Sequence, residues 1–288
     1  MSFYSANSLT NALLPAVLEA GRLEMRHFTG GVAIEHKADR SPVTAADREA
    51  EAIILAALAR LAPDIPVVAE EAASAGLLPP AASRFFLVDA LDGTRLFVKG
   101  KPEFTVNIAL IENARPVFGL VYVPPTGSLY ITRDDGHSYA ATILPDAPDS
   151  SIGNMVHERL TSRPPDPANL LAFNSRTAGG ASSDFLNRLG VKEARPLGSS
   201  LKFCLIAKGE GDIYARFGET YEWDTAAGQV ILEAAGGTVA TLDGATLTYG
   251  KANKAYLNPH FIAWGRQPLP MPAAAPGQGG KHLPQNGQ

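Results

Sequence analysis

The sequence is poor in cysteine and histidine, and both shortages exclude kinds of site. Cys204 is the only cysteine among 288 residues, so the chain can form neither an intrachain disulfide nor a zinc site built on cysteines. A single thiol fits a reducing compartment. None of the six histidines lies near the acidic groups described below in the sequence. Because transition metals usually recruit histidine, those acids favour a cation that prefers oxygen ligands.

A basic excess and long hydrophobic runs are also missing. The formal net charge is -4, which argues against a protein that binds nucleic acid polymers through a basic face. No apolar run approaches the length of a bilayer, and residues 1–10 lack the basic start and apolar core of a signal peptide. We therefore expect a cytoplasmic protein without a transmembrane segment. Whether it is a monomer or a homodimer stays open.

Apolar residues are plentiful and regularly spaced. Hydrophobic residues make up 45% of the chain and charged residues 19%, as in soluble globular proteins. Apolar periodicity predicts helices over residues 9–28 and 43–62, and short strands near 67–69 and 85–88. Residues 104–132 predict three strands in an antiparallel meander.

The second half of the chain predicts alternating strands and helices. The polar segment 134–167, rich in Pro, Asp and Ser, is the expected domain boundary, and we assign it no function. The elements expected beyond it are strands at 170–173 and 212–215 and helices near 183–189, 200–208 and 225–235. We expect an N-terminal α+β part over residues 1–135, a C-terminal α/β part over 136–267 and a disordered tail over 268–288.

The most informative segment is 87–94, where an apolar run carries Asp89 and Asp92 directly into Gly93-Thr94. Acids are rarely placed at the end of a buried strand unless a cation pairs with them, and a divalent metal is the simplest such partner. The Gly-Thr step can open a helix whose backbone N–H groups suit a phosphate. The segment therefore predicts a metal, an anion and a reaction between them.

Further acids fall at expected element ends in the same manner. The full set is Asp47, Glu70, Asp89, Asp92 and Asp224. Mg²⁺ prefers oxygen ligands and is usually held by a few carboxylates together with a substrate phosphate. Acids from separate loops could hold two such ions a few ångströms apart, which clamps the attacking water and the leaving oxygen of a phosphoryl transfer.

Each of these acids also fits a purely structural role. Asp47 lies three residues after Thr44, so it fits a capping box as well as it fits catalysis, and the two roles are compatible. Taken alone, Glu70-Glu71 fits a solvated surface pair. Asp224 fits the N-cap of the helix that follows it. Asp89 is harder to explain structurally, because it ends an apolar run.

Four short motifs resemble those of the lithium-sensitive, magnesium-dependent phosphomonoesterases, of which the inositol monophosphatases are the best-known members. The motifs are Val43–Asp47, Ala69–Glu71, Asp89–Thr94 and Trp223–Gly228, in the order of the family. The resemblance implies a fold of the α/β (α+β) class, a layered α/β/α/β/α sandwich with the active site between the two parts. It also implies Mg²⁺ as cofactor, as two or three ions.

Three longer stretches are similar to one branch of that superfamily, the bacterial 3'(2'),5'-bisphosphate nucleotidases. They are Pro102–Ile111, Gly198–Leu205 and Tyr214–Gly218. The similarity implies hydrolysis of the 3'-phosphate of 3'-phosphoadenosine 5'-phosphate to give AMP, and so a place in sulfur metabolism. Two alternatives stay open: an inositol or sugar phosphate monophosphatase, and a catalytically silent protein that binds phosphorylated ligands.

The resemblance also assigns metal ligands. Glu70, Asp89 and the backbone carbonyl of Leu91 would hold a first magnesium ion. Asp89, Asp92 and Asp224 would hold a second. A third, weaker ion would lie near Glu70, mostly surrounded by water.

The reaction implied by the resemblance is in-line attack by a metal-held water without a covalent intermediate. Asp47 and Thr94 would orient and deprotonate that water. The N–H groups of Gly93 and Thr94 would receive the phosphate that is cleaved. For the other phosphate, Ser199 and Lys202 would lie on one face if a helix begins there, and Arg216 could add a forked contact.

The sequence departs from the branch at three places. Ala90 replaces the proline usual in the aspartate motif, and Arg95-Leu96-Phe97 replaces the usual Lys-Glu-Phe. Asn174–Thr177 stands where the branch reads Ser-Arg-Ser-His, so that Thr177 replaces a histidine expected to help hold the nucleotide. None of these changes removes a predicted metal ligand.

Overall fold

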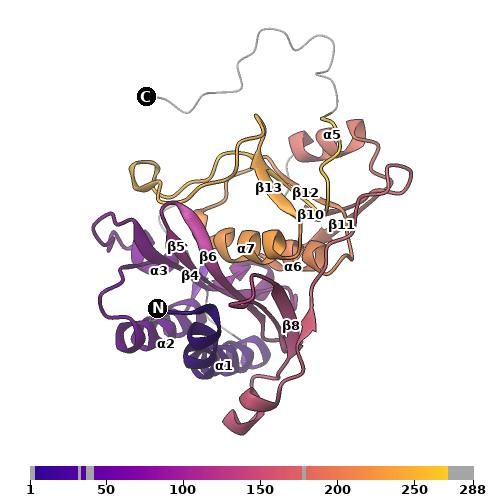
Figure 1. Cartoon of the computed structure of the whole chain (residues 1–288). Helices are drawn as coiled ribbons and strands as arrows, with labels where there is room; N and C mark the ends of the chain where they lie inside the picture. Colours follow the sequence, from indigo (N-terminus) through magenta and orange to yellow (C-terminus); the bar gives the residue numbers. More distant parts are fainter. Residues whose placement is uncertain (1–3, 32–33, 37–41, 177–179, 272–288) are drawn as a thin grey trace.

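Helices and sheets alternate through the molecule in five layers. The structure is a computed structural model that describes residues 4–31, 34–36, 42–176 and 180–271. A helix pair covers one sheet, a second helix pair separates that sheet from another, and a single helix lies beyond (Figure 1). This order confirms the layered α/β/α/β/α sandwich that the sequence predicts.

The larger sheet has seven strands in chain order. They are β3 (Val67–Ala69), β4 (Arg84–Asp92), β5 (Thr105–Glu112), β6 (Arg115–Val123), β7 (Ser128–Thr132), β8 (Ser138–Thr142) and β9 (Glu158–Arg159). β3 pairs with β4 in parallel, and all the other pairs are antiparallel. The predicted meander is therefore confirmed, and β8 and β9 extend it.

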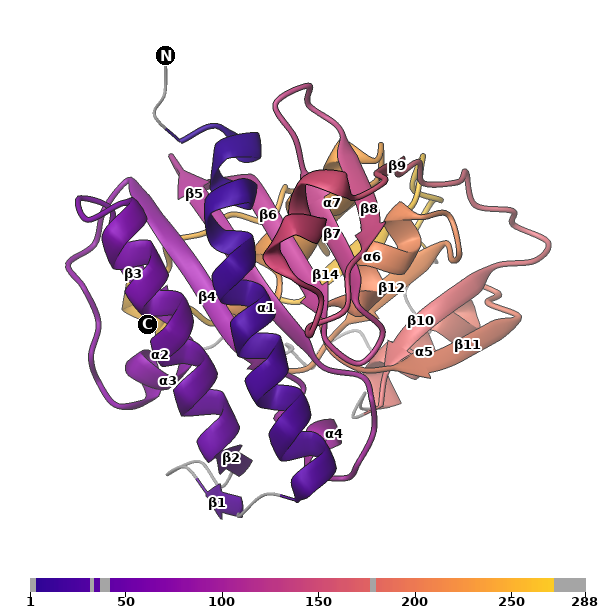
Figure 2. The ribbon, with the colours of Figure 1, turned by 90° about the horizontal axis from the view of Figure 1, so that it is seen from below.

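Two long helices cover the outer face of this sheet. α1 (Ala6–Gly30) and α2 (Ala45–Leu61) lie side by side across the strands (Figure 2). Leu13 and Val17 of α1, and Ile54 and Leu58 of α2, are fully buried because the apolar spacing places them on the sheet side. Each such side chain contributes on the order of 2 kcal/mol to stability. A small hairpin of β1 (Ile34–His36) and β2 (Pro42–Thr44) leads into α2.

The smaller sheet is mixed and has the order β11-β10-β12-β14-β13. Its strands are β10 (Leu171–Ser175), β11 (Glu193–Leu197), β12 (Ile213–Arg216), β13 (Thr238–Thr241) and β14 (Phe261–Trp264). α5 (Gly180–Arg188) packs on its outer face, whereas α6 (Leu201–Ala207) and α7 (Ala226–Ala234) fill the layer between the two sheets.

The two halves of the molecule are in close contact through α7. A Cβ on Gly119 of β6 would lie 2.6 Å from the carbonyl oxygen of Ala227, so only glycine allows this approach. Phe203 of α6 stacks on Phe261 of β14 at 5.9 Å, and both are fully buried. The division into two domains stays a prediction; the strands favour a boundary between residues 160 and 170, later than residue 135.

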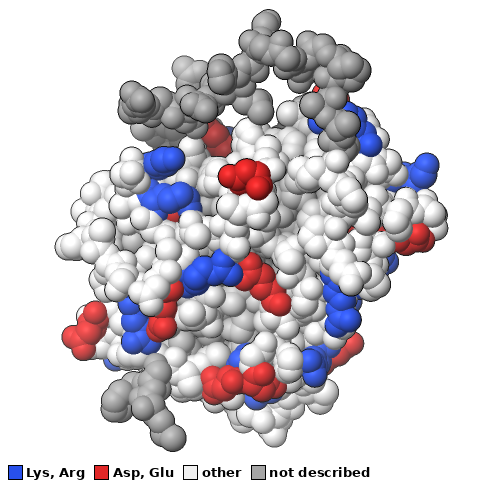
Figure 3. Space-filling model, turned by 45° about the horizontal axis from the view of Figure 1, so that its top comes forward, with Lys and Arg blue, Asp and Glu red and all other residues white. Residues whose placement is uncertain are grey.

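Several sequence predictions bear on the surface and the ends of the chain. No helix among the described residues is long and apolar enough to cross a membrane. On the face in Figure 3, Lys and Arg alternate with Asp and Glu, and no extended basic area is visible among the described residues. Thr177 and most of the predicted tail lie outside the described residues.

Candidate active site

A cavity of about 630 Å³ lies where the two halves meet, and nearly all the predicted site residues line it. One end is acidic and the other basic. The acidic end carries Glu70, Asp89, Asp92 and Asp224, next to Gly93 and Thr94; the basic end carries Ser199, Lys202 and Arg216. A larger cavity, of about 810 Å³, lies against β7, β8 and residues 146–158 and contains none of these residues.

A bulge in β4 explains how Asp89 and Asp92 come to line one cavity. In a regular strand, residues three apart point to opposite faces. Asp89 pairs with Asn107 and Asp92 with Thr105, so β4 carries one residue more than β5 between these pairs. The extra residue brings the second acid back to the first one's side. The sequence predicts Asp89 at the end of a strand, but in the structure it lies inside β4, which continues to Asp92.

Three carboxylates converge at the acidic end. Glu70, Asp89 and Asp224 each offer an oxygen atom, and these atoms lie within 4.8 Å of one another. Burial, followed by the charges of Glu70, Asp92 and Asp224, raises the pKa of Asp89 well above its usual value. Burial likewise raises the pKa of Asp224 to about 8. Without a cation, the fold therefore disfavours the ionisation of Asp89 and Asp224.

Asp92 lies beside this cluster and accepts hydrogen bonds from both halves of the molecule. Its Oδ2 accepts hydrogen bonds from the backbone N–H of Ser200 at 2.6 Å and from Asn107 Nδ2 at 3.3 Å. Burial raises the pKa of Asp92, although the nearby Lys202 ammonium opposes this shift. Asp92 is therefore the acid that links the two ends of the cavity.

Asp47 and Thr94 form the hydrogen bond that the sequence predicts. Thr94 donates from Oγ1 to Asp47 Oδ1 at 2.7 Å. The other oxygen of Asp47 accepts from the backbone N–H of Thr44 at 2.8 Å and from its hydroxyl at 2.6 Å. The two roles that the sequence left open are thus compatible in the structure, because each uses a different carboxylate oxygen.

Glu70 begins the short helix α3 (Glu70–Ser74), which is capped from a distance. Glu51 of α2 is buried and accepts hydrogen bonds from the N–H groups of Glu71 at 2.8 Å and Ala72 at 2.9 Å. Since α2 also carries Asp47 one turn earlier, one helix positions both residues. Glu70 is half-buried and faces the cavity, so it is not a solvated surface acid.

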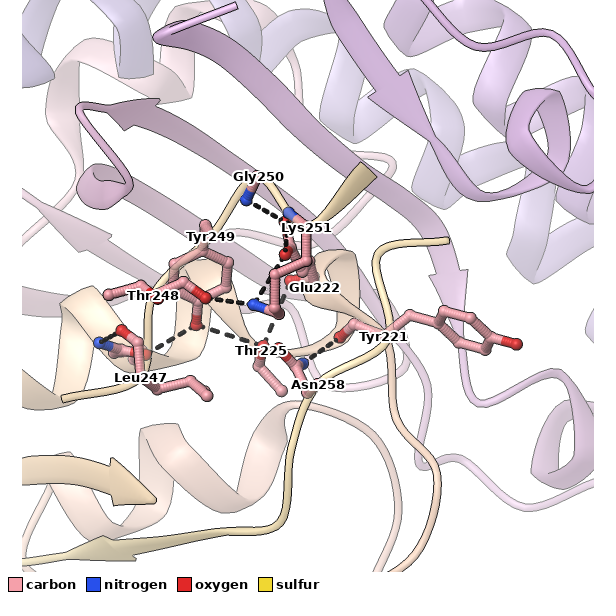
Figure 4. A network of polar contacts seen from close by, with 10 residues as sticks. Tyr221, Glu222, Thr225, Leu247, Thr248, Tyr249, Gly250, Lys251 and Asn258 are labelled. Carbon is pink, nitrogen blue, oxygen red and sulfur yellow. Dashed lines mark hydrogen bonds and ion pairs between the residues drawn. The ribbon is translucent and has the colours of Figure 1, made fainter. Parts of the chain in front are cut away.

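A buried polar network fixes the segment that carries Asp224 (Figure 4). Glu222 is fully buried and accepts from the N–H groups of Gly250 at 2.7 Å and Lys251 at 2.9 Å, and its carboxylate pairs with the Lys251 ammonium at 2.7 Å. Asp224 itself accepts from Tyr221 N at 2.9 Å. The predicted N-cap of α7 is wrong by one residue, since α7 has Thr225 in that position; Asp224 instead closes a capping box on the 3₁₀ helix Glu222–Asp224.

The basic end differs from its prediction in one respect. α6 begins at Leu201, and Ser199 precedes it with φ of +50°, so Ser199 and Lys202 do not share a helix face. Lys202 is nonetheless buried, and its Nζ donates to the Ser199 carbonyl at 2.5 Å and to the Leu197 carbonyl at 3.3 Å. Burial lowers the pKa of Lys202 to about 8. Arg216 donates to the carbonyl of Glu219.

Some residues at the site were not found from the sequence. Arg176 lines the cavity, and Tyr214 lies under the Lys202 ammonium, 4.9 Å from Nζ to the ring centre. Asn107 and Glu51 support the acids. Asn107 and Glu51 are polar side chains on the buried faces of otherwise apolar elements. A polar residue that interrupts an apolar face could have marked them in the sequence. Arg176 lies in the segment Asn174–Thr177 that the sequence comparison with the nucleotidases had singled out, but it was not itself predicted to line the site.

The acidic end fits a divalent cation. Among the described residues, no lysine, arginine or histidine forms an ion pair with Asp89 or Asp224. Buried carboxylates without a cationic partner are costly, and an all-oxygen ligand set suits Mg²⁺. The site residues therefore agree with a magnesium cofactor.

Fold and site together define a layered sandwich protein with a carboxylate cluster between its two halves. The sequence pattern of the inositol monophosphatase family matches residues 5–268, and the chain belongs to this family. The 3'(2'),5'-bisphosphate nucleotidase CysQ of Salmonella typhimurium is 41% identical over 244 residues, covering 84% of this chain and 94% of the relative.

More distant relatives agree with this assignment. The 3'(2'),5'-bisphosphate nucleotidase CysQ of Buchnera aphidicola is 34% identical over 268 residues, covering 91% of this chain and 97% of the relative. Among solved structures, CysQ from Bacteroides thetaiotaomicron matches with a TM-score of 0.73 and 33% identity, over 91% of this chain and 98% of that one. The resemblance found from the motifs is therefore confirmed.

Proposed function

We propose that the protein is a magnesium-dependent phosphomonoesterase that hydrolyses the 3'-phosphate of 3'-phosphoadenosine 5'-phosphate, giving AMP and phosphate. The observation that carries the proposal is the polarity of one cavity, with a carboxylate cluster at one end and Lys202 and Arg216 at the other. A substrate with two phosphates matches both ends. Relatives called 3'(2'),5'-bisphosphate nucleotidase, similar over most of the chain, support the same substrate.

The acids would hold the cofactor in two overlapping sets. Glu70, Asp89 and the carbonyl of Leu91 would bind one ion, and Asp89, Asp92 and Asp224 a second; a third, weaker ion would lie near Glu70. When bound, Mg²⁺ would supply the positive charge that polarises the phosphate and stabilises the leaving oxygen. This division among ions is part of the proposal.

The chain's own groups would handle the proton. The Thr94 hydroxyl donates a hydrogen bond to Asp47. The oxygen of that hydroxyl can therefore accept a proton from water while the hydroxyl proton moves to the Asp47 carboxylate. The water oxygen then bonds to phosphorus, and the bond from phosphorus to the ribose 3'-oxygen breaks. That oxygen keeps the electron pair and takes a proton from solvent water, and Asp47 returns its proton to the solvent. The N–H groups of Gly93 and Thr94 would receive the phosphate that leaves.

The basic end would fix the second phosphate. Lys202, Ser199 and Arg216 all line the cavity, and each carries a hydrogen-bond donor. Charge-assisted hydrogen bonds of this kind are roughly twice as strong as neutral ones. These three residues would therefore decide between a bisphosphate and a monophosphate.

A substrate panel tests the proposal. Purified protein with Mg²⁺ is assayed against 3'-phosphoadenosine 5'-phosphate, inositol 1-phosphate and fructose 1,6-bisphosphate, with and without lithium. We expect the highest kcat/KM for the nucleotide, and inhibition by lithium. No turnover of any substrate would contradict a phosphatase, and equal turnover of all three would contradict the nucleotide preference.

A further inference from the structure

Glu103 connects three segments that are far apart in the sequence but meet at the cavity. It lies just before β5 and does not line the cavity itself. Its Oε2 accepts from Arg176 Nε at 2.8 Å and from the backbone N–H of Gly198 at 2.8 Å, and its Oε1 accepts from Arg176 Nη2. We call these three residues the Glu103 bridge.

The backbone of Glu103 is packed as tightly as its side chain. A Cβ on Gly93 would lie 2.8 Å from the Glu103 carbonyl oxygen, and a Cβ on Gly198 would lie at the same distance from it. Gly93 belongs to the loop proposed to receive the phosphate that is cleaved. Gly198 begins the loop proposed to receive the other one. One residue thus fixes the spacing between the two loops.

The second loop is strained and needs such support. Ser199 follows Gly198 and has φ of +50°, a left-handed backbone conformation that residues other than glycine rarely adopt. Residues in this conformation persist only when their surroundings hold them there. The Glu103 carboxylate holds the N–H of Gly198 on one side, and Lys202 holds the carbonyl of Ser199 on the other.

The charge of Glu103 makes the bridge strong. Hydrogen bonds from Arg176, followed by that from Gly198, lower the pKa of Glu103, so its carboxylate stays ionised at neutral pH. A forked pair between a guanidinium and a carboxylate also fixes orientation. Arg176 is thereby presented to the cavity in one position.

We propose that Glu103 is a positioning residue that holds the segment Gly198–Lys202 and Arg176 in place, and so sets the preference of the site for a substrate with a second phosphate. The identity of that phosphate rests on the proposed function. The bridge itself does not, because its contacts involve only this chain.

Two measurements on Glu103→Gln test the inference. The amide keeps the size of the side chain but loses its charge and one acceptor. We expect hydrogen exchange of the amides in residues 198–202 to rise about tenfold, since their support is weakened. We also expect KM for 3'-phosphoadenosine 5'-phosphate to rise about tenfold with kcat nearly unchanged. For adenosine 3'-phosphate, which lacks the second phosphate, both constants should change less than about twofold.

Glu193→Gln is the matched control. It also breaks an ion pair with an arginine, Arg195, but on the exposed edge strand β11, and should change neither measurement. If Glu103→Gln does not fold, Arg176→Ala removes one arm of the bridge and should raise exchange at 198–202 by a smaller factor. Exchange at these amides unchanged from wild type, or equal KM increases for both nucleotides, would overturn the inference. If the wild-type protein is inactive on every nucleotide, faster exchange in Glu103→Gln would still support the bridge, and only the proposed function would be contradicted.

Discussion

At the acidic end of the cavity, Asp89 is presented by a buried strand and Asp224 by a turn locked in a polar network. At the basic end, Ser199 lies on a strained loop just before α6, which carries Lys202, and this loop is supported by Glu103, 95 residues before Gly198. Both ends thus depend on contacts between distant segments, such as those from Ser200 to Asp92 and from Gly198 to Glu103, but among the described residues that line the cavity only Ser199, at the basic end, is a non-glycine residue in a left-handed conformation. The end that would perform the reaction is therefore formed without a strained residue other than glycine, whereas the end that would choose the substrate needs its surroundings to hold one.

Removing the acid shared by both proposed ions tests the acidic end and has the largest expected effect. Asp89→Asn should lower kcat by more than about 1,000-fold, because it removes a ligand from each ion. Its fold should remain, since the raised pKa shows that a charged carboxylate is unfavourable in this position. Turnover and thermal unfolding of the metal-free protein are compared with those of Asp243→Asn, an exposed control. Near-normal turnover would rule out the metal assignment.

Removing the buried ammonium tests the basic end separately. Lys202→Ala should raise KM for 3'-phosphoadenosine 5'-phosphate about 10- to 100-fold and hardly affect a monophosphate. It also leaves the carbonyls of Leu197 and Ser199 without their donor, so exchange at residues 198–202 should rise. Steady-state kinetics with both nucleotides gives the answer. Equal losses on both substrates would remove Lys202 from the second-phosphate site.

The same contrast explains how much the sequence could predict. The helices over 6–30 and 45–61, the meander and the acidic motifs were all accessible, because apolar periodicity and short local motifs determine them. The bulge that turns Asp92 toward Asp89 was not, since it depends on the register with β5. The orientation of Arg176 was not accessible either, because the distant carboxylate of Glu103 determines it. Nor was the position of Ser199 outside α6, because its left-handed backbone conformation determines that.

The stability of the metal-free protein tests the acidic end with the smallest effect. The folded-state pKa values of Asp89, Asp92 and Asp224 are raised above an unfolded value of about 3.9. The folded state therefore binds more protons than the unfolded state between these values. Stability is fully present below pH about 4 and is lost as pH rises toward the folded pKa, which for Asp224 is about 8.

In a chelator, the melting temperature should therefore fall by about 5 °C or more between pH 5 and pH 8. Mg²⁺ should restore more of it at pH 8, because protons compete with the cation at pH 5. Glu24 contributes to the same slope, since it is fully buried on α1 and its pKa is also raised by burial. Glu24→Gln removes that share but leaves the part that Mg²⁺ reverses. A melting temperature that stays level or rises over this range without metal would contradict an acidic end whose buried carboxylates need a cation to be held in charged form.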